Sequence, residues 1–380
     1  EGTVAHYQDI DEYRKKKLAQ RKKRLIMGFG LLVAALAVFL TVFFLVRSNR
    51  KSGISHDSTF PLLIHGEQLE DIYAVGNHLA VLTQSGLYIY DVNGTETYSV
   101  SHGCSNAAVY EAGDRLLTFD RGGTKLRVDD VKGNCGELTM ENPILCAQIA
   151  DDGTVLAITS HEQYASYLQV YDDKMNLRYR YGSASESFSM AAFSPDQTHI
   201  AACAIESSNG SFMASISVFD YTSEQTAQTY QIPDILPLYM TYTSSSGLIV
   251  VGTDRIAFLN TDTGESSVTE YEGTLQQFVC GSSDVTAIVT DNPLNGASAL
   301  TLFDQDGREI ETTAVSDSPI DLCLTNNRIL LLGRKMVYHY NLSLELQEEI
   351  PLESSAQKIT YTGGSMFLLG ADTISKYSIR

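Results

Sequence analysis

Metal binding and acid–base catalysis are the first chemistry to test, because the chain has eight histidines. Zinc sites that can be recognised from local sequence place two ligands a few residues apart, as in His-Glu-x-x-His. The histidines have no such spacing; they stand at His6, His56, His65, His78, His102, His161, His199 and His339. The sequence therefore predicts no metal site, with a site assembled from distant segments as the alternative that local spacing cannot test.

Pairs of acidic residues are the second kind of candidate ligand. They occur at Asp129-Asp130, Asp151-Asp152, Asp172-Asp173 and Asp304-Gln305-Asp306-Gly307. A calcium loop of the EF-hand type would continue with more oxygen ligands and a distant bidentate Glu. Because these pairs fall on turns that recur along the chain, we expect them to shape turns rather than hold ions.

Nucleophilic and phosphate-binding motifs are missing from the sequence. There is no Gly-x-Ser-x-Gly elbow and no Gly-x4-Gly-Lys-Ser/Thr loop. Serines are frequent, as at Ser244 to Ser246, but the sequence assigns no base to any of them. We therefore predict no catalytic residue and no cofactor, and we expect a protein that is not an enzyme.

The six cysteines divide by their surroundings. Four lie in apolar runs and are expected to act as small buried hydrophobic residues: Cys146, Cys203, Cys280 and Cys323. Cys104 and Cys135 lie in polar segments and are the one pair considered for a disulfide. We favour six free thiols, with the pairing of Cys104 and Cys135 left open.

An uncharged run from Leu25 to Val46 determines where in the cell the rest of the chain is located. Its 22 residues give roughly 33 Å of helix at about 1.5 Å per residue, enough to cross a hydrocarbon core of about 30 Å. The run is longer than the apolar region of a signal peptide and does not end in small residues. The sequence therefore predicts an uncleaved transmembrane signal anchor.

Positive charge predicts the orientation of this anchor. Eight Lys and Arg precede the run, including Arg21, Lys22, Lys23 and Arg24, and only three follow it closely. Since the more basic flank stays in the cytoplasm, we expect a single-pass protein of the plasma membrane with an extracytoplasmic C-terminal domain. The expected parts are a cytoplasmic tail 1–24, the anchor 25–46, a linker 47–58 and an extracytoplasmic domain 59–380.

Charge is distributed very unevenly between these parts. Residues 1–51 carry 11 Lys and Arg against four acids, a net charge of +7, whereas residues 52–380 carry 16 against 42, a net charge of −26. An acidic domain of this kind repels nucleic acid and anionic polymers. We therefore expect no nucleic-acid partner.

A pattern of short apolar strands recurs along the exported part. Each unit has a third strand that ends in a characteristic pair, at Tyr90-Asp91, Asp129-Asp130, Tyr171-Asp172, Phe219-Asp220, Leu259-Asn260, Phe303-Asp304, Tyr340-Asn341 and Tyr377-Ser378. These pairs are 37 to 48 residues apart. Turn residues follow them, as in Asn93-Gly94 and Asp306-Gly307. Four short strands repeated at this period predict an all-β fold, a β-propeller of four-stranded blades.

Eight units can be counted, and seven is the alternative if the irregular unit from about 189 to 237 is divided differently. The last unit ends after its third strand. The segment from Phe60 to His65 precedes the first unit and has no unit of its own. We expect it to supply the missing fourth strand, with Pro61 tolerated because that strand lies at an edge.

The recurring hairpins resemble those of WD40-like and quinoprotein-like propellers. The chain has no tryptophan, so the resemblance does not extend to the Trp-Asp signature or to quinone-cofactor chemistry. A basic tail, one anchor and an acidic propeller together resemble a family of single-pass clostridial membrane proteins with an extracellular domain of unknown function. That resemblance implies a location at the cell surface.

The function expected from these features is binding. A membrane-tethered propeller without a catalytic constellation is predicted to act as a binding or scaffold module for an envelope protein or glycan. One alternative is a propeller hydrolase or lyase that acts on envelope polymers, with its site at the axial opening. The other is a single-pass sensor that signals through the basic tail. The sequence leaves the ligand, the face used and the oligomeric state open.

Overall fold

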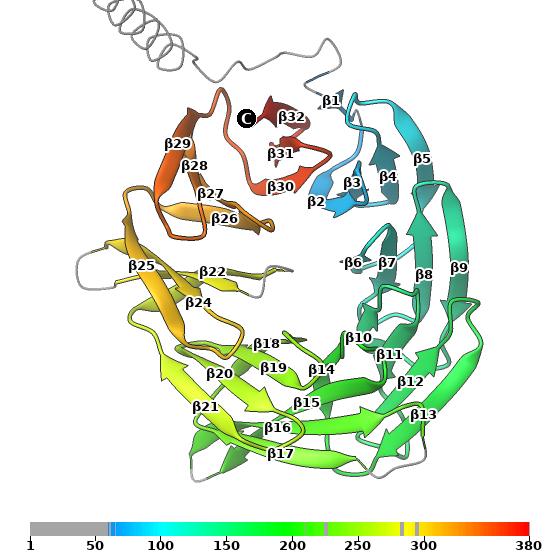
Figure 1. Cartoon of the computed structure of the whole chain (residues 1–380). Helices are drawn as coiled ribbons and strands as arrows, with labels where there is room; N and C mark the ends of the chain where they lie inside the picture. The colour runs from blue at the N-terminus through cyan, green and yellow to red at the C-terminus, as the bar shows by residue number, and fades with distance from the viewer. Residues whose placement is uncertain are drawn as a thin grey trace, which may run out of the picture. The chain divides into compact units, whose positions relative to one another are not determined.

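The computed structural model describes residues 60–379, apart from 61, 65, 209, 224–226, 282–284 and 293–295. The described residues form one compact unit, in which eight four-stranded antiparallel sheets follow one another around a ring (Figure 1). Within the described residues, no helix has the length and apolar character needed to cross a membrane. The predicted anchor Leu25–Val46 and its flanking cations Arg21 to Arg24 lie outside the described residues.

The blades are numbered 1 to 8 in chain order, and each contributes one strand to the centre of the ring (Figure 1). These first strands are β2 (Leu69–Val75), β6 (Ala107–Ala112), β10 (Ile144–Ile149), β14 (Phe188–Phe193), β18 (Pro237–Tyr242), β22 (Thr274–Cys280), β26 (Pro319–Leu324) and β30 (Lys358–Thr362). The second strands are β3 (His78–Thr83), β7 (Arg115–Asp120), β11 (Val155–Thr159), β15 (His199–Ser208), β19 (Gly247–Gly252), β23 (Thr286–Asp291), β27 (Ile329–Gly333) and β31 (Ser365–Leu369).

The remaining two strands of each blade lie farther from the axis. The third strands are β4 (Gly86–Tyr90), β8 (Lys125–Asp130), β12 (Ser166–Tyr171), β16 (Ser211–Asp220), β20 (Arg255–Asn260), β24 (Ser298–Phe303), β28 (Met336–Tyr340) and β32 (Thr373–Ser378). The outer strands are β5 (Glu96–Ser101), β9 (Gly133–Thr139), β13 (Leu177–Ser183), β17 (Gln228–Pro233), β21 (Ser266–Glu270), β25 (Glu309–Val315), β29 (Leu346–Pro351) and, for blade 8, β1 (Leu62–Leu63). The count of eight blades is therefore confirmed.

The apolar core lies between neighbouring blades. Second strands are buried on both faces, as in β27, where every residue from Ile329 to Gly333 is buried. Such strands read as continuous apolar runs because each face is covered by another blade. Between blades 6 and 7, for example, Leu302 packs with Leu331 and Tyr340.

Ring closure joins the two ends of the described chain. β1 pairs antiparallel with β32, with Leu62 opposite Ile374 and Leu63 opposite Thr373. The ring of Phe60 lies 5.7 Å from that of Phe367, centroid to centroid. The prediction that the segment after residue 59 completes the last blade is confirmed.

The hairpins after the third strands explain the repeated Asp and Asn residues. The Asp91 side chain accepts hydrogen bonds from the backbone N–H groups of Asn93 and Thr95, at 2.9 and 2.8 Å. Equivalent bonds form at Asp130, Asp172, Asp220, Asn260, Asp304 and Asn341. These side chains hold the backbone in a tight turn. Most residues of the acidic pairs thus shape turns, as predicted. Asp129 is the exception, because it lies within β8 and pairs with Arg127.

The antiparallel strands give the ring two distinct faces. The crossover face carries the connections between blades and the turns between second and third strands. The hairpin face carries the turns between first and second strands and the side-chain-capped hairpins after the third strands. The extra length of the irregular unit is a longer hairpin of β15 and β16, which have ten residues each.

The closing contact gives a direct stability test. Replacement of Phe60, which is 8% exposed, by Ala should lower the free energy of unfolding by about 3 kcal/mol, because it removes a buried ring between the ends of the chain. Leu177 is 45% exposed on an outer strand, and L177A should change the free energy by no more than about 0.5 kcal/mol. Urea unfolding followed by circular dichroism measures both. Equal effects of the two substitutions would contradict the assigned role of Phe60.

Candidate functional site

The first strands share an irregularity that shapes the axis. Six of the eight contain a β-bulge at the same register position. The extra residues are Glu70, Leu145, Ser189, Leu238, Gln276 and Ile320. Because a bulge bends its strand and changes the direction of the next side chains, it sets which residues of the first strands meet around the axis.

Side chains form hydrogen bonds with some of the unpaired backbone groups at the inner edges of the sheets. Each first strand has one edge without a neighbouring strand, so some of its backbone groups need other partners. The backbone N–H of Ala74 donates to the Glu111 carboxylate of the next blade at 3.0 Å. The N–H of Ile359 donates in the same way to Asp321 at 2.9 Å. Acidic residues therefore bridge neighbouring blades at the axis.

Two adjoining cavities of about 430 and 550 Å³ occupy the centre of the ring. They share Tyr73, Glu111, Ala112, Asp151 and Cys280, and together they are lined by all eight first strands. We call the combined space the axial channel. Residues of the turns between first and second strands also line it, so the channel reaches the hairpin face.

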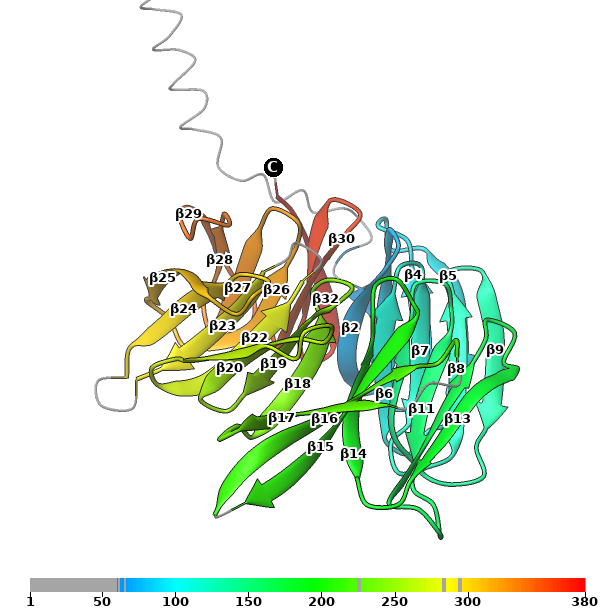
Figure 2. The same cartoon turned by 60° about the horizontal axis from the view of Figure 1, so that its bottom comes forward.

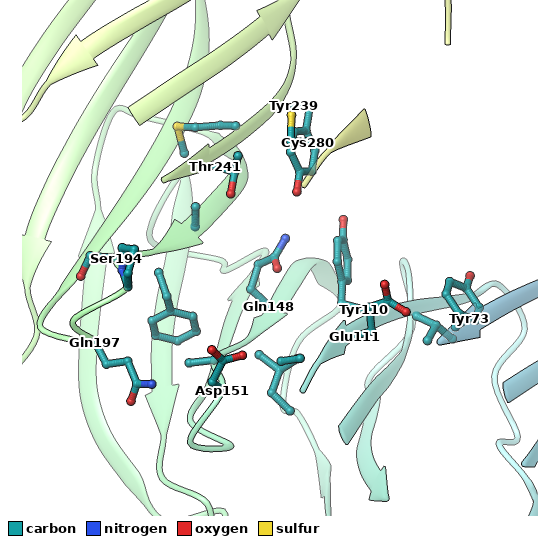
Figure 3. A pocket seen from close by; sticks show the side chains of 18 residues that line it. Tyr73, Tyr110, Glu111, Gln148, Asp151, Ser194, Gln197, Tyr239, Thr241 and Cys280 are labelled. Atoms are coloured by element: carbon teal, nitrogen blue, oxygen red, sulfur yellow. The ribbon is translucent and has the colours of Figure 1, made fainter. Parts of the chain in front are cut away.

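The polar groups of the channel come from separate blades and converge on one space (Figure 3). The side chains of Tyr110 and Gln148 point toward Tyr239 and Cys280 across it. Glu111 lies between Tyr110 and Tyr73. Hydroxyl, amide and carboxylate groups are thus available to a ligand, together with the faces and edges of tyrosine rings.

Burial controls the ionisation of the carboxyl groups near the axis. Burial raises the pKa of Glu111, although the bond from the Ala74 N–H opposes this shift. Burial likewise raises the pKa of Asp321, against the attraction of Lys358. The Lys358 ammonium is 3.7 Å from the Asp71 carboxylate, so that positive charge is shared between two acids.

The charged side chains that line the channel are acidic. Its lining residues include the acids Glu111 and Asp151, and none of the described residues that line it is Lys, Arg or His. Burial also raises the pKa of Tyr73 and of Tyr239, so both hydroxyls stay protonated and can donate hydrogen bonds. A site with this lining attracts a cation or a neutral polar group and repels an anion.

Two cysteines of the channel correct a prediction. Cys280 and Cys323 are only partly buried, and both line the channel, although Cys280 also packs against the apolar core between blades 5 and 6. Burial raises the pKa of Cys280 to about 11 and that of Cys323 to about 12. Both thiols are therefore protonated at neutral pH and are weak nucleophiles. Cys146 and Cys203 are buried, as predicted.

The other sequence candidates do not form a site. Cys104 and Cys135 are free, and they lie toward opposite ends of blade 2, before β6 and at the start of β9. His102 is buried and structural: its Nδ1 accepts a hydrogen bond from the Cys104 N–H at 3.0 Å. Among the described residues, no group of three or more His, Cys, Asp or Glu is placed to hold a metal ion.

Sequence reasoning missed the axial residues. Glu111 and Gln148 are polar residues within otherwise apolar first strands. A polar residue in such a strand is the feature of the sequence that could have identified them as site residues. Their meeting with Tyr73 and Tyr239 depends on blade order and on the bulges, which the sequence does not display.

The arrangement defines a β-propeller with an acidic, tyrosine-rich axial channel. The chain belongs to the family described as Family of unknown function (DUF5711), whose model matches residues 63–379. A search of curated proteins gave no match.

Solved structures with a similar fold differ widely in sequence. BamB from Moraxella catarrhalis has a TM-score of 0.51 and 13% identity, over 82% of this chain and 94% of that one. Sqt1 from Saccharomyces cerevisiae has a TM-score of 0.56 and 12% identity, over 84% of this chain and 98% of that one. The C-terminal WD40 domain of Sif2 has a TM-score of 0.61 and 10% identity, over 84% of this chain and 99% of that one. At these identities the likeness concerns the fold alone, and the resemblance to WD40-like propellers is confirmed at that level.

The raised pKa of Glu111 predicts how a single variant responds to pH. A carboxyl group whose pKa is higher in the folded chain stabilises the fold below its unfolded pKa, and this contribution is lost as the pH rises through the folded pKa. E111Q removes the titration. The melting temperature of E111Q relative to the unmodified protein should therefore rise between pH 4 and pH 7. A difference that stays constant or falls over this range would contradict the assigned shift.

Proposed function

We propose that this protein is a binding module of the cell envelope, tethered to the plasma membrane by Leu25–Val46. The basic residues Arg21 to Arg24 keep the N-terminal tail in the cytoplasm, and the propeller lies outside. The length and charge of the N-terminal segment support the tether. The acidic character of residues 52–380 supports an exposed, soluble propeller.

The ligand of the axial channel is a cationic group. The observation that carries this proposal is a channel that Glu111, Asp151 and tyrosine hydroxyls line, with no basic side chain among the described lining residues. A primary ammonium would meet carboxylate charge and tyrosine rings together, and both attract cations. An envelope protein offers such groups as Lys side chains, and an envelope glycan offers them as unacetylated amino sugars.

Glycoside hydrolysis is a second candidate function, because Glu111 has the raised pKa that a general acid needs and Asp151 lines the same channel. Binding is preferred because the Glu111 carboxylate already accepts the Ala74 N–H, a role that positions it within the fold. Incubation of the protein with the oligosaccharide probe described below distinguishes the two: products seen by mass spectrometry, and lost in E111Q, would indicate hydrolysis.

Ligand binding should depend on the channel carboxylates. Calorimetry on the full chain in neutral detergent would use two probes, a glucosamine tetrasaccharide and a blocked Gly-Lys-Gly peptide, each compared with its N-acetylated form. We expect the charged form of one probe to bind, with an affinity about 10-fold or more lower for E111Q or D151N, because each substitution removes a charged partner. Affinity should fall on acidification at a higher pH than for an ordinary carboxylate, because the pKa of Glu111 is raised.

The control for this measurement is E311Q, an exposed acid on the outer strand β25. It should leave the affinity within about twofold of the original. Binding of the acetylated probes as tightly as the charged ones, or an equal loss in E311Q and E111Q, would overturn the assignment of a cationic ligand. The probe that binds identifies the source, protein or glycan.

The tether and its orientation can be tested through an exposed thiol. Cys135 is free and exposed on the propeller. A membrane-impermeant maleimide should label it in intact spheroplasts, and C135S should lose that label. In the C135S background, a cysteine introduced as Gln20→Cys should react only after lysis. Deletion of 25–46 should release the protein from carbonate-washed membranes; labelling of position 20 in intact spheroplasts would contradict the orientation.

A further inference from the structure

The β15–β16 hairpin of blade 4 projects from the crossover face. Second and third strands of the other blades have five or six residues, whereas β15 and β16 have ten each. β15 pairs with β14 only as far as Ala204, and β16 pairs with β17 only from Met213. The end of the hairpin therefore continues beyond the rest of its sheet, past β17 and β18 (Figure 2).

One face of this projection is apolar and turned toward blade 5. Ile205 is paired with Ala214, and Phe212 is paired with Ser207. Residues directly opposite each other in a sheet share a face, so Ile205, Phe212 and Ala214 lie on the same side. Ala214 packs into the core between blades 4 and 5. Beyond that core, Ile205 and Phe212 are 41% and 52% exposed.

The crossover end of blade 5 presents another exposed apolar side chain. Leu238, the extra residue of the bulge in β18, is 46% exposed. It lies near the start of its strand, at the crossover face. We call Ile205, Phe212 and Leu238 the apolar ledge. Exposed apolar residues elsewhere, such as Val268 and Ile310, sit singly on outer strands of different blades. Ile205 and Phe212, by contrast, share one face of a single hairpin, and apolar exposure grouped in this way is typical of an interaction surface.

The charges beside the ledge select the partner. Asp234 precedes β18 and Asp254 precedes β20, and both are exposed. Arg255 is held by Asp254 at 2.8 Å and by Glu270 at 3.3 Å, so its charge is already neutralised. The blade end therefore has an excess of negative charge. A second copy of this chain, whose residues 52–380 carry a net charge of −26, would be repelled by it.

We propose that the apolar ledge docks a polypeptide segment of a partner protein that carries aliphatic side chains beside Lys or Arg. The aliphatic groups cover Ile205, Phe212 and Leu238, and the basic groups face Asp234. This surface lies on the crossover face, whereas the axial channel reaches the hairpin face. The two sites are independent, and either proposal can fail without the other.

Binding of defined peptides tests the ledge. The probes are three fluorescent octapeptides with blocked ends: central Leu-Leu flanked by Lys, the same flanked by Glu, and Ser-Ser flanked by Lys. Anisotropy is measured on the full chain in neutral detergent, with the signal of empty micelles subtracted. The Leu–Lys peptide should bind at least about 10-fold more tightly than either other peptide, because only it matches both the apolar and the charged groups.

Substitutions then place the site. The double variant I205S/F212S should weaken binding of the Leu–Lys peptide by about 10-fold or more, and D234N should weaken it while reducing its salt dependence. Asn tolerates the positive φ of 57° at position 234. The matched control V268S/I310S removes similarly exposed apolar groups from outer strands and should leave the affinity unchanged.

Three results would overturn the proposal. They are equal binding of the three peptides, an equal effect of I205S/F212S and V268S/I310S, and a dimer in sedimentation that I205S/F212S dissociates. The last result would make the ledge a contact between copies of this chain. Unchanged thermal unfolding of I205S/F212S, expected because both side chains are exposed, shows that a loss of binding is not a loss of folding.

Discussion

A small β-sheet has two faces, and an isolated sheet of this sequence would leave two apolar faces in water. This constraint governs the molecule. Each blade is covered on both sides by neighbours, so the second strands are continuous apolar runs such as Ile329 to Gly333. Coverage of every blade requires a closed ring, and closure requires β1 to pair with β32. The cores between blades, the axial channel and the two faces all follow from that closure.

Closure also creates the axial channel. Eight first strands face the centre, each with an unpaired edge, and backbone groups at such an edge need partners. Glu111 and Asp321 supply acceptors to the N–H groups of Ala74 and Ile359. The same carboxyl groups lie where burial raises their pKa. Satisfaction of the sheet edge thus gives this part of the ring its acidic chemistry.

The capped hairpins repeat around the ring, whereas blades 2 and 4 differ from the repeat in one feature each. Asp91 and its equivalents hold tight turns through backbone N–H groups, which is a structural task repeated around the ring. Asp129 occupies the place of an aromatic residue in this pattern and is fully buried against Arg127 at 2.7 Å, with a hydrogen bond from Tyr98 of blade 1. Blade 4 differs from the other blades in the length of its β15–β16 hairpin, which carries the exposed Ile205 and Phe212.

Local sequence indicated the strands, the hairpin turns and the closing segment, because alternating or continuous apolar runs and turn residues act over a few positions. It left eight or seven blades open, and the structure decided for eight. It also predicted the anchor and its orientation, which rest on hydropathy and charge and await the experiments above. Only the tertiary structure decided that Tyr73, Glu111, Gln148 and Tyr239 share one space. Their convergence depends on ring closure and on bulges in the first strands, and both are properties of contacts between segments distant in the chain.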